Sequence, residues 1–394
     1  MRRLPARWRI SAVGLVLLAG FAALHACALP AYEFFTRIPD GVAKPHPFVD
    51  LRAILQGGAC WRAGVNVYTP SACLDGGVFN YSPLLLRAAL LPIGPWDTLA
   101  GGVLFCLAYM AALARLPPPA GHREFWLRLA ASFSPAAYYA LEQGNLDVAI
   151  FAAVVAVLGL PGRYGVFALA AAAKFYPVAL FILALREKRH VVLALGVAGL
   201  AALALAVALY GHDLFRAVAI IPSGTPFRAS FGRIDLPRGL AMLHLLRYPD
   251  AMGWGLALGG GMVAWKLRRG WEQALARLDT MRAEALVAGA AVTLFCFLAA
   301  QNVEYRAIFL LLTLPGLCRI TGAKRWLALP WVVLALLWEA VPRAMIGGLW
   351  QAYLPGPEMF AFWLLRQALW WWLAVEFAAL VLGFVSREAR RLKN

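Results

Sequence analysis

The sequence predicts an all-α polytopic membrane protein, and three observations lead to this fold class. Of the 394 residues, 62% are hydrophobic and only 14% are charged, and the mean hydropathy is +0.69. Soluble domains carry about 25% charged residues, and disordered chains have low hydrophobicity, so both classes are excluded. The apolar residues form long runs, several of which approach the roughly 20 residues that a bilayer crossing requires. The Lys and Arg residues concentrate in the connections on one side of these apolar runs, as membrane proteins require of their cytoplasmic side.

The first apolar run covers residues 10–29 and follows an arginine-rich tail, which predicts a cytoplasmic N-terminus. The run is too long for the hydrophobic region of a signal peptide, and no clear cleavage site follows it, so we expect an uncleaved anchor. Later apolar runs, some of them short for a full crossing, cover residues 97–113, 125–141, 146–160, 164–185, 191–210, 252–265, 285–300, 307–317, 326–341 and 360–385.

The run at 164–185 is interrupted by Lys174 and Pro177, and basic residues follow it. A basic connection also precedes it, which places both of its ends on the cytoplasmic side. We therefore expect two half-helices, 164–173 and 175–185, folded back on each other, since broken helices are tolerated where they line a protein cavity. Counting this hairpin as two gives about 12 transmembrane or half-membrane helices, with both termini cytoplasmic.

The net charge of +17 is explained by this topology. The predicted cytoplasmic segments contain 23 Lys and Arg against 6 Asp and Glu, whereas the outer segments contain 12 against 13. Such an excess on one face is the positive-inside pattern, so no nucleic-acid partner is needed. We expect a multi-pass protein of the inner (plasma) membrane whose partner is the lipid bilayer.

The chain is expected to form a single integral membrane domain, 1–394, with two outer segments. Residues 31–96 would be a first outer loop with short membrane-parallel helices, and residues 211–250 a second outer segment. No cytoplasmic connection is long enough for a soluble domain, so an active site would be extracytoplasmic. Cys60 and Cys73 both fall in the first outer loop, where a disulfide is expected because disulfides persist outside the cytoplasm.

Asp50 is the acidic residue of the first outer loop that best fits a catalytic role. It begins a segment of helical character, 51–61, so it could cap a helix N-terminus. Alternatively it could act as a general base toward a hydroxyl acceptor, for which one well-placed carboxylate suffices. Asp40 and Asp75 compete for that role, although Asp75 precedes two glycines and has the pattern of a turn residue.

Three stretches in order resemble glycosyltransferase family 87. The first comprises Asp50, Gly57-Gly58, the Gly-Val-Asn-Val-Tyr of 64–68 and the Phe-Asn-Tyr-Ser-Pro-Leu of 79–84. The second is Glu-Gln-Gly-Asn-Leu at 142–146, which is similar to a G-Q-x-N element of that family, and the third is Ala-Lys-Phe-Tyr-Pro at 173–177, which is similar to its K-x-x-P break. The resemblance covers roughly residues 45–190.

The resemblance implies the C-type glycosyltransferase fold. It also implies an inverting hexosyltransferase that takes a sugar, commonly mannose, from a polyprenyl-phosphate donor on the outer side of the membrane. Asp50 matches the catalytic carboxylate, and the acceptor would be a lipid-linked glycan, a glycolipid or a cell-surface polysaccharide. Ser82 stands where the family has a second proline, and Asn-Val-Glu-Tyr-Arg at 302–306 replaces a W-x-H-Y-like element, which leaves acceptor identity open.

A phosphate leaving group requires cationic or backbone donors in a site of low dielectric constant. Lys174 is a candidate because a lysine at membrane depth is functional by default, the alternative being an ion pair with Asp147 or Glu142. Each of the other candidates could instead be structural: an arginine could pair with an acid or a lipid headgroup, and a polar side chain could satisfy a tight turn. The remaining donor-phosphate or substrate-binding candidates are Arg306, Arg343, Glu304, Tyr305, Glu142, Gln143, Asn145, Tyr68, Tyr81 and Arg233.

We expect no cofactor and no metal, because no D-x-D or E-x-D pair occurs and a lipid monophosphate donor needs no metal. Other functions remain open from the sequence. A transporter or flippase of lipid-linked glycans would share the broken helices and the intramembrane lysine but would not need Asp50. A polymerase or ligase of lipid-linked glycans and a non-catalytic membrane scaffold are the others.

Overall fold

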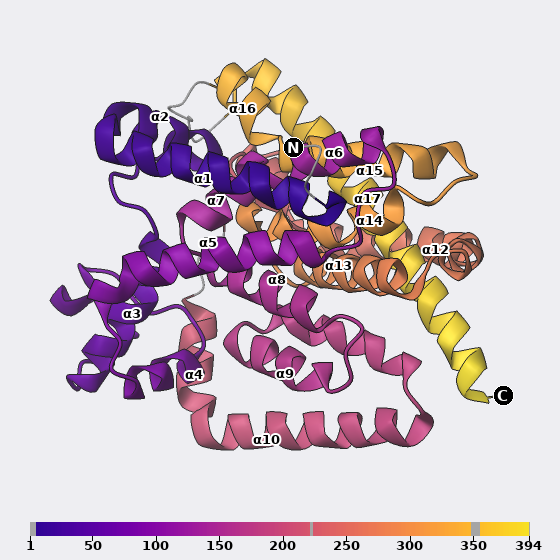
Figure 1. The fold of residues 1–394 in the computed structure, drawn as a ribbon, viewed down its shortest axis with the longest axis horizontal. Coiled ribbons are helices and arrows are strands. Elements are labelled where there is room, and N and C mark those ends of the chain that lie inside the picture. The colour runs from indigo at the N-terminus through magenta and orange to yellow at the C-terminus, as the bar shows by residue number, and fades with distance from the viewer. Residues whose placement is uncertain (1–4, 221–223, 348–354, 394) are drawn as a thin grey trace.

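The computed structural model describes residues 5–220, 224–347 and 355–393, and this part of the chain is almost entirely helical (Figure 1). The N-terminal half forms α1 (Arg9–Cys27), α2 (Leu29–Asp40), α3 (Val49–Arg62), α4 (Pro83–Leu86), α5 (Thr98–Arg115), α6 (His122–Ser132), α7 (Pro135–Glu142), α8 (Leu146–Val157) and α9 (Arg163–Ala173). The C-terminal half forms α10 (Arg189–Ala219), α11 (Asp235–Met242), α12 (Pro249–Ala276), α13 (Thr280–Ala299), α14 (Leu314–Leu317), α15 (Lys324–Leu337), α16 (Ala340–Gly347) and α17 (Pro357–Lys393).

Short 3₁₀ helices and one small strand pair connect these elements. The 3₁₀ helices are η1 (Ala6–Trp8), η2 (Ala72–Leu74), η3 (Arg87–Leu90), η4 (Pro95–Asp97), η5 (Tyr176–Arg186) and η6 (Glu304–Leu312). The strands β1 (Ser230–Phe231) and β2 (Asn302–Val303) pair antiparallel, with Ser230 opposite Val303. They join the second predicted outer segment to the start of η6.

Several helices are long and apolar enough to cross a membrane. In the part of the chain that the structure describes, five pass this test: Ala6–Cys27, Pro95–Arg115, Arg189–Ala219, Thr280–Ala299 and Pro357–Leu392. Two bent pairs, α7 with α8 and α15 with α16, bring the number to seven if each pair is one span. The apolar window of Arg189–Ala219 has no buried residue, and so large an apolar surface is compatible with a lipid bilayer. The chain is therefore a helical protein suited to a membrane.

The predicted break at Lys174 is confirmed. Lys174 has extended backbone angles and ends α9, and η5 follows with Pro177 in its first turn, so the two half-helices fall where the sequence places them. The predicted run 125–141 is wrong as a single helix. Ser134 adopts an extended conformation before Pro135, which disfavours a helical predecessor, and its Oγ caps α7 by accepting from the Ala137 amide at 3.3 Å.

Two further boundaries differ from the prediction. The run 326–341 bends by 51° between α15 and α16. The predicted span 191–210 is part of α10, which continues to Ala219, so residues 211–219 of the predicted second outer segment belong to this helix.

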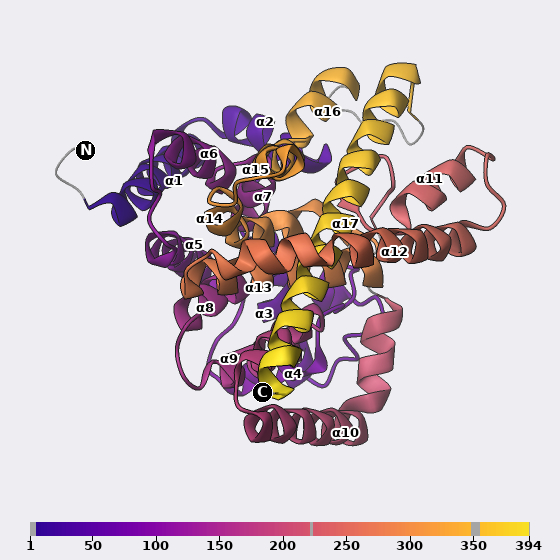
Figure 2. The ribbon, with the colours of Figure 1, turned by 90° about the vertical axis from the view of Figure 1, so that its right-hand side faces the viewer.

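The core of the molecule surrounds α13, most of whose residues are buried. It packs against η5, η6, α14 and α17, and Figure 2 shows α17 running past α12 and α13 along the length of the molecule. Gly383 lets α17 approach α12 closely, because a Cβ atom at this position would lie 2.7 Å from the carbonyl oxygen of Arg268. These contacts hold η6, which carries Tyr305 and Arg306, in a fixed place.

Segments that the sequence analysis assigns to one side of the membrane lie together. Arg163 pairs with Glu284 at 2.7 Å and with Glu187 at 3.0 Å, and Arg186 pairs with Glu284 at 3.0 Å. The C-terminal Arg391 donates to the backbone carbonyls of 185–187. Ion pairs therefore join the connections on both sides of the half-helices to the start of α13, and hydrogen bonds join the second of these connections to the end of α17.

Candidate functional site

Asp50 is positioned by the turn between α7 and α8. The amide of Asp50 donates to the carbonyl oxygen of Gln143 at 2.9 Å, and the amide of Phe48 donates to that of Glu142 at 2.6 Å. Gly144 in this turn has a φ of +59°, and a Cβ atom there would lie 3.0 Å from the Phe48 Cβ. A side chain at this position would thus be strained by its backbone and by the first turn of α3.

The Asp50 carboxylate faces a chain of polar side chains. Its Oδ2 accepts a hydrogen bond from the Asn145 amide nitrogen, and Asn145 Oδ1 accepts one from Lys174 Nζ at 2.8 Å. Lys174 Nζ also pairs with Asp147 Oδ1, whose side chain is fully buried. Three predicted motifs, far apart in the sequence, therefore meet through direct contacts.

Arg306, from the 302–306 stretch that departs from the family pattern, also lies in this cluster. Its Nη1 donates to Asn302 Oδ1 at 2.5 Å, and its Nε lies 3.9 Å from Asp147 Oδ2. Neither of these last two atoms has a hydrogen-bond partner among the residues described. Arg306 thus retains donor capacity next to the pair formed by Lys174 and Asp147.

Three tyrosines border the same cluster. The hydroxyl of Tyr176 donates to Asp147 Oδ1 at 2.6 Å. Lys174 Nζ lies 5.9 Å from the ring centroid of Tyr81 and 5.7 Å from that of Tyr305, both within range of a cation–π contact. We call this group the Asp50 cluster, and its members are Asp50, Tyr81, Asn145, Asp147, Lys174, Tyr176, Tyr305 and Arg306.

The structure excludes one of the two roles that the sequence leaves open for Asp50, that of a helix cap. The helix α3 begins at Val49, and its N-cap residue is Phe48, so Asp50 does not cap the helix. Burial raises the pKa of the Asp50 carboxyl above its ordinary value, while the hydrogen bond from Asn145 and the charges of Lys174 and Lys44 act in the opposite direction. The Asp50 carboxylate is therefore set in a partly dehydrated site with one side-chain donor.

The competing acids of the first outer loop have other surroundings. Asp75 is exposed and has a φ of +51°, in agreement with its prediction as a turn residue. Asp40 pairs with Lys44 at 2.7 Å and accepts a hydrogen bond from the Tyr139 hydroxyl at 2.8 Å. Neither carboxylate contacts Asn145.

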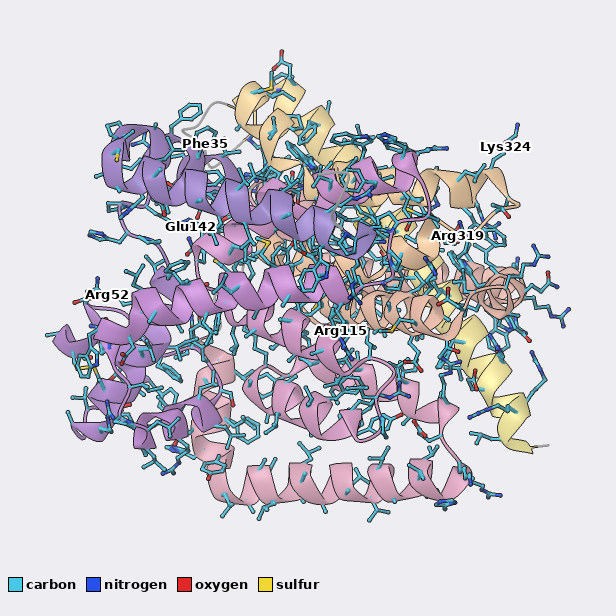
Figure 3. The ribbon with its side chains drawn as sticks, viewed as in Figure 1. Phe35, Arg52, Arg115, Glu142, Arg319 and Lys324 are labelled. Carbon is cyan, nitrogen blue, oxygen red and sulfur yellow. A yellow bond between two sulfur atoms is a disulfide. The ribbon has the colours of Figure 1, made fainter. Side chains whose placement is uncertain are left out.

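Glu142 and Gln143 lie beside the Asp50 cluster without joining it. Their backbone carbonyls anchor the start of α3, and the Gln143 side chain donates to the carboxyl of Glu142. Glu142 is buried, and Figure 3 shows it on the same side of the molecule as Arg52, with Lys324 on the opposite side. The structure thus gives both residues a role in holding the turn.

Tyr68 and Arg233 are not brought to Asp50. The ring of Tyr68 packs on Phe79, and its hydroxyl has no hydrogen-bond partner among the residues described. Arg233 donates to the Leu298 carbonyl at 2.7 Å, and its guanidinium lies 3.8 Å from the ring centroid of Trp254.

Arg343 and Glu304 belong to a second buried cluster. Arg343 Nη2 lies 3.0 Å from Glu304 Oε2 and donates to the Pro39 carbonyl at 2.6 Å, while its Nε lies 3.3 Å from Glu339. Arg366 then links Glu339, at 3.3 Å, to a further buried carboxylate.

That further carboxylate is Asp235 at the start of α11, which lies 3.2 Å from Arg366. It also accepts hydrogen bonds from Ser230, Gln301 and Gln367, so every oxygen has partners. Sequence reasoning missed this cluster, although Arg366 within an apolar run is a signal, because an intramembrane charge requires a partner. The cluster ties α16 and α17 to the second outer segment.

No group of three or more His, Cys, Asp or Glu side chains within 5–220, 224–347 and 355–393 is arranged to hold a metal ion. The fold and the site together define a helical protein suited to a membrane, with the charged and polar Asp50 cluster between its helices. No family model, curated protein or solved structure matches the chain.

The first loop carries a disulfide between Cys60 and Cys73, the two residues that we predict to pair. The bond links η2 to α3, the helix whose second residue is Asp50. Because it closes a short loop, replacing both cysteines by serine should destabilise this segment by about 3 kcal/mol. Limited proteolysis of the wild type and the double variant should show faster cleavage between residues 62 and 82 in the variant. Equal cleavage rates would contradict a stabilising role, and a Cys27→Ser variant is the control.

Proposed function

We propose that the protein is an inverting glycosyltransferase that moves a hexose, most simply mannose, from a polyprenyl-phosphate donor to a hydroxyl acceptor on the outer side of the membrane. The observation that carries the proposal is the meeting of the three motifs and Arg306 in the Asp50 cluster, which supplies a carboxylate, an amide and two cations. The C-type glycosyltransferase fold, about 12 membrane or half-membrane helices and cytoplasmic termini belong to the same proposal.

In this mechanism Asp50 takes the proton of the acceptor hydroxyl. The acceptor oxygen forms a bond to the anomeric carbon, while the bond from that carbon to the phosphate oxygen breaks and its electron pair leaves with the polyprenyl phosphate. A single displacement of this kind inverts the anomeric centre. General-base assistance typically contributes about 10²–10⁴-fold to the rate.

Arg306 is the cation best suited to the leaving phosphate. Lys174 already donates to Asn145 and Asp147, so its charge is largely committed within the protein. Arg306 lies farther from Asp147, at 3.9 Å, and its side chain is 19% exposed, against 9% for Lys174. Preorganised donors in a site of low dielectric constant stabilise developing charge without needing to reorganise.

The test is donor turnover by the purified protein in liposomes that contain a polyprenyl-phosphate-linked hexose. We expect the hexose to appear on a hydroxyl acceptor and polyprenyl phosphate to be released in equal amount. Movement of the intact donor between leaflets without cleavage would support the transporter alternative and contradict the proposal. Extension of a lipid-linked glycan by whole repeat units would support the polymerase alternative.

The pH dependence of transfer should report on Asp50. As the base it must be ionised, so activity falls as the pH drops through its pKa, which burial raises above the ordinary carboxyl value. Replacing Asn145 by Ala removes a hydrogen bond that lowers this pKa, and the acid limb should therefore move to higher pH. Measuring kcat/KM from pH 4 to 9 for both proteins checks this, and a limb that moves to lower pH contradicts it.

A further inference from the structure

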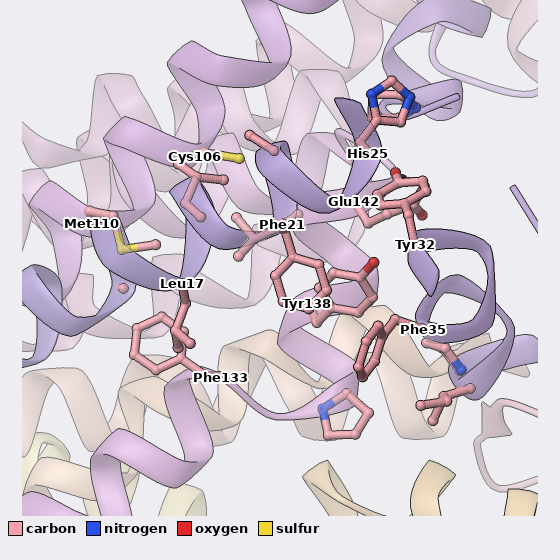
Figure 4. Close-up of a pocket in the computed structure, with 18 of the residues that line it drawn as sticks. Leu17, Phe21, His25, Tyr32, Phe35, Cys106, Met110, Phe133, Tyr138 and Glu142 are labelled. Carbon is pink, nitrogen blue, oxygen red and sulfur yellow. Dashed lines mark hydrogen bonds between the residues drawn. The ribbon is translucent and has the colours of Figure 1, made fainter. Parts of the chain in front are cut away.

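An apolar cavity of about 740 Å³ lies between α1, α2, α5, α6 and α7. Its walls are formed almost entirely by aliphatic and aromatic side chains, among them Leu17, Phe21 and Phe133 (Figure 4). Val103 of α5 also lines the cavity. Its volume is within the range of about 300–1,000 Å³ that is usual for sites of small ligands. The helix α1 on one side is apolar and largely unburied, so this side of the cavity is suited to the apolar region of a bilayer.

One corner of this cavity is polar. The hydroxyl of Tyr32 donates to Glu142 Oε1 at 3.2 Å, and the ring of His25 lies edge-on to that of Tyr32, with 4.9 Å between centroids. These side chains come together in Figure 4. No lysine or arginine lines the cavity in the part of the chain that the structure describes. The lining of the corner thus offers hydrogen-bonding groups and no positive charge, and the ammonium of Lys44, which acts on the Glu142 carboxyl, is paired with Asp40 at 2.7 Å.

Backbone hydrogen bonds and the charge of Lys44 connect the polar corner to Asp50. Phe48, which lines the cavity, donates its amide to the Glu142 carbonyl, and the amide of Asp50 donates to the next carbonyl. The ammonium of Lys44 interacts electrostatically with the carboxyls of both Glu142 and Asp50. A ligand head bound at the corner would therefore lie beside the start of the helix that carries Asp50.

We infer that this cavity binds the acceptor, and that the acceptor is a lipid with an apolar chain and an uncharged, hydroxyl-bearing head such as a sugar. The inference rests on the proposed function and deepens it by choosing the class of acceptor. The chain would occupy the apolar part between α1 and α5. The head would meet Tyr32, Glu142 and His25 and present a hydroxyl toward Asp50.

Charge complementarity selects this ligand over the donor. A carboxyl group hydrogen-bonds hydroxyls in either protonation state, but it provides no positive charge for a phosphate. The cation proposed for the phosphate, Arg306, belongs to the Asp50 cluster and does not line the cavity. Two lipids, one phosphorylated and one neutral, would then approach Asp50 from different sides.

The test uses two photoactivatable probes with the same diazirine-bearing dodecyl chain, one with a mannose head and one with a phosphate head. The full-length protein in liposomes is labelled with each, and the labelled peptides are identified by mass spectrometry. We expect the mannoside to label α1 and α5 and the phosphate to label them at least about tenfold less. In Val103→Trp, which fills the cavity, labelling by the mannoside should fall at least about tenfold.

The matched control is Leu104→Trp, because Leu104 is the next residue of α5 and does not line the cavity. It should be labelled like the wild type. In transfer assays with dodecyl mannoside as acceptor, Val103→Trp should raise the KM of the mannoside and leave that of the donor unchanged. Equal labelling by the phosphate probe, or a raised KM for the donor, would overturn the inference.

The labelling result does not depend on the reaction. If the wild type cleaves no polyprenyl-phosphate-linked hexose with any acceptor, the proposed function fails, whatever the probes show. If donor cleavage occurs but the mannoside labels α1 and α5 of the wild type no more than the same helices of the Val103→Trp variant, the cavity assignment alone fails.

Discussion

Replacing Asp50 by Asn is expected to lower sugar transfer about 10²–10⁴-fold, the usual contribution of a general base. The substitution keeps the shape of the side chain and removes the charge that accepts the proton. Asn145 donates to Asp50 in the wild type, and an amide oxygen at position 50 can accept the same hydrogen bond. The fold and donor binding should therefore persist.

Asp75→Asn is the matched control for this prediction. It makes the same chemical change in the same loop, but Asp75 is exposed and its carboxylate accepts a long hydrogen bond from Gln56 at 3.4 Å. Both variants are compared with the wild type in liposomes, by the rate of hexose transfer and by the Kd of a non-cleavable polyprenyl-phosphate donor analogue. Unchanged transfer in Asp50→Asn removes Asp50 as the base, and loss of donor binding gives it a different role.

The elements of the site could be predicted from the sequence because each depends on a local signal. The break at Lys174 follows from a charged residue and a proline within one apolar run, and the structure ends α9 at that point. The turn before α8 follows from Gly144 and Asn145, which favour a positive φ and an N-cap. Such signals act within one or two helical turns.

The partners within the site could not be predicted, because contacts between distant segments leave no local trace. The sequence left Lys174 with either Asp147 or Glu142 as a partner, and the structure pairs it with Asp147. Likewise, nothing near Arg343 distinguishes a phosphate ligand from the buried partner of Glu304 and Glu339. These choices depend on how η5, η6 and α16 pack.

Breaking the pair between Lys174 and Asp147 is expected to destabilise the protein strongly. Removing one member of a buried ion pair leaves an uncompensated charge and typically costs about 3–5 kcal/mol. Lys174→Met and Asp147→Asn should each lower the thermal midpoint, whereas the double variant should lose much less than the sum of the two. Unfolding can be followed with a thiol-reactive dye, because Cys106 and Cys296 are buried free thiols.

The double variant also separates the structural role of Lys174 from a role in binding phosphate. Lys174 fixes the Asn145 side chain that donates to Asp50, so transfer should stay at least about tenfold below the wild type even where stability is regained. Donor affinity should be unchanged, because the proposal assigns the phosphate to Arg306, whose side chain is more exposed than that of Lys174. Single variants as stable as the wild type would contradict a stabilising ion pair. Weakened donor binding in the stable double variant would assign the phosphate to Lys174 instead.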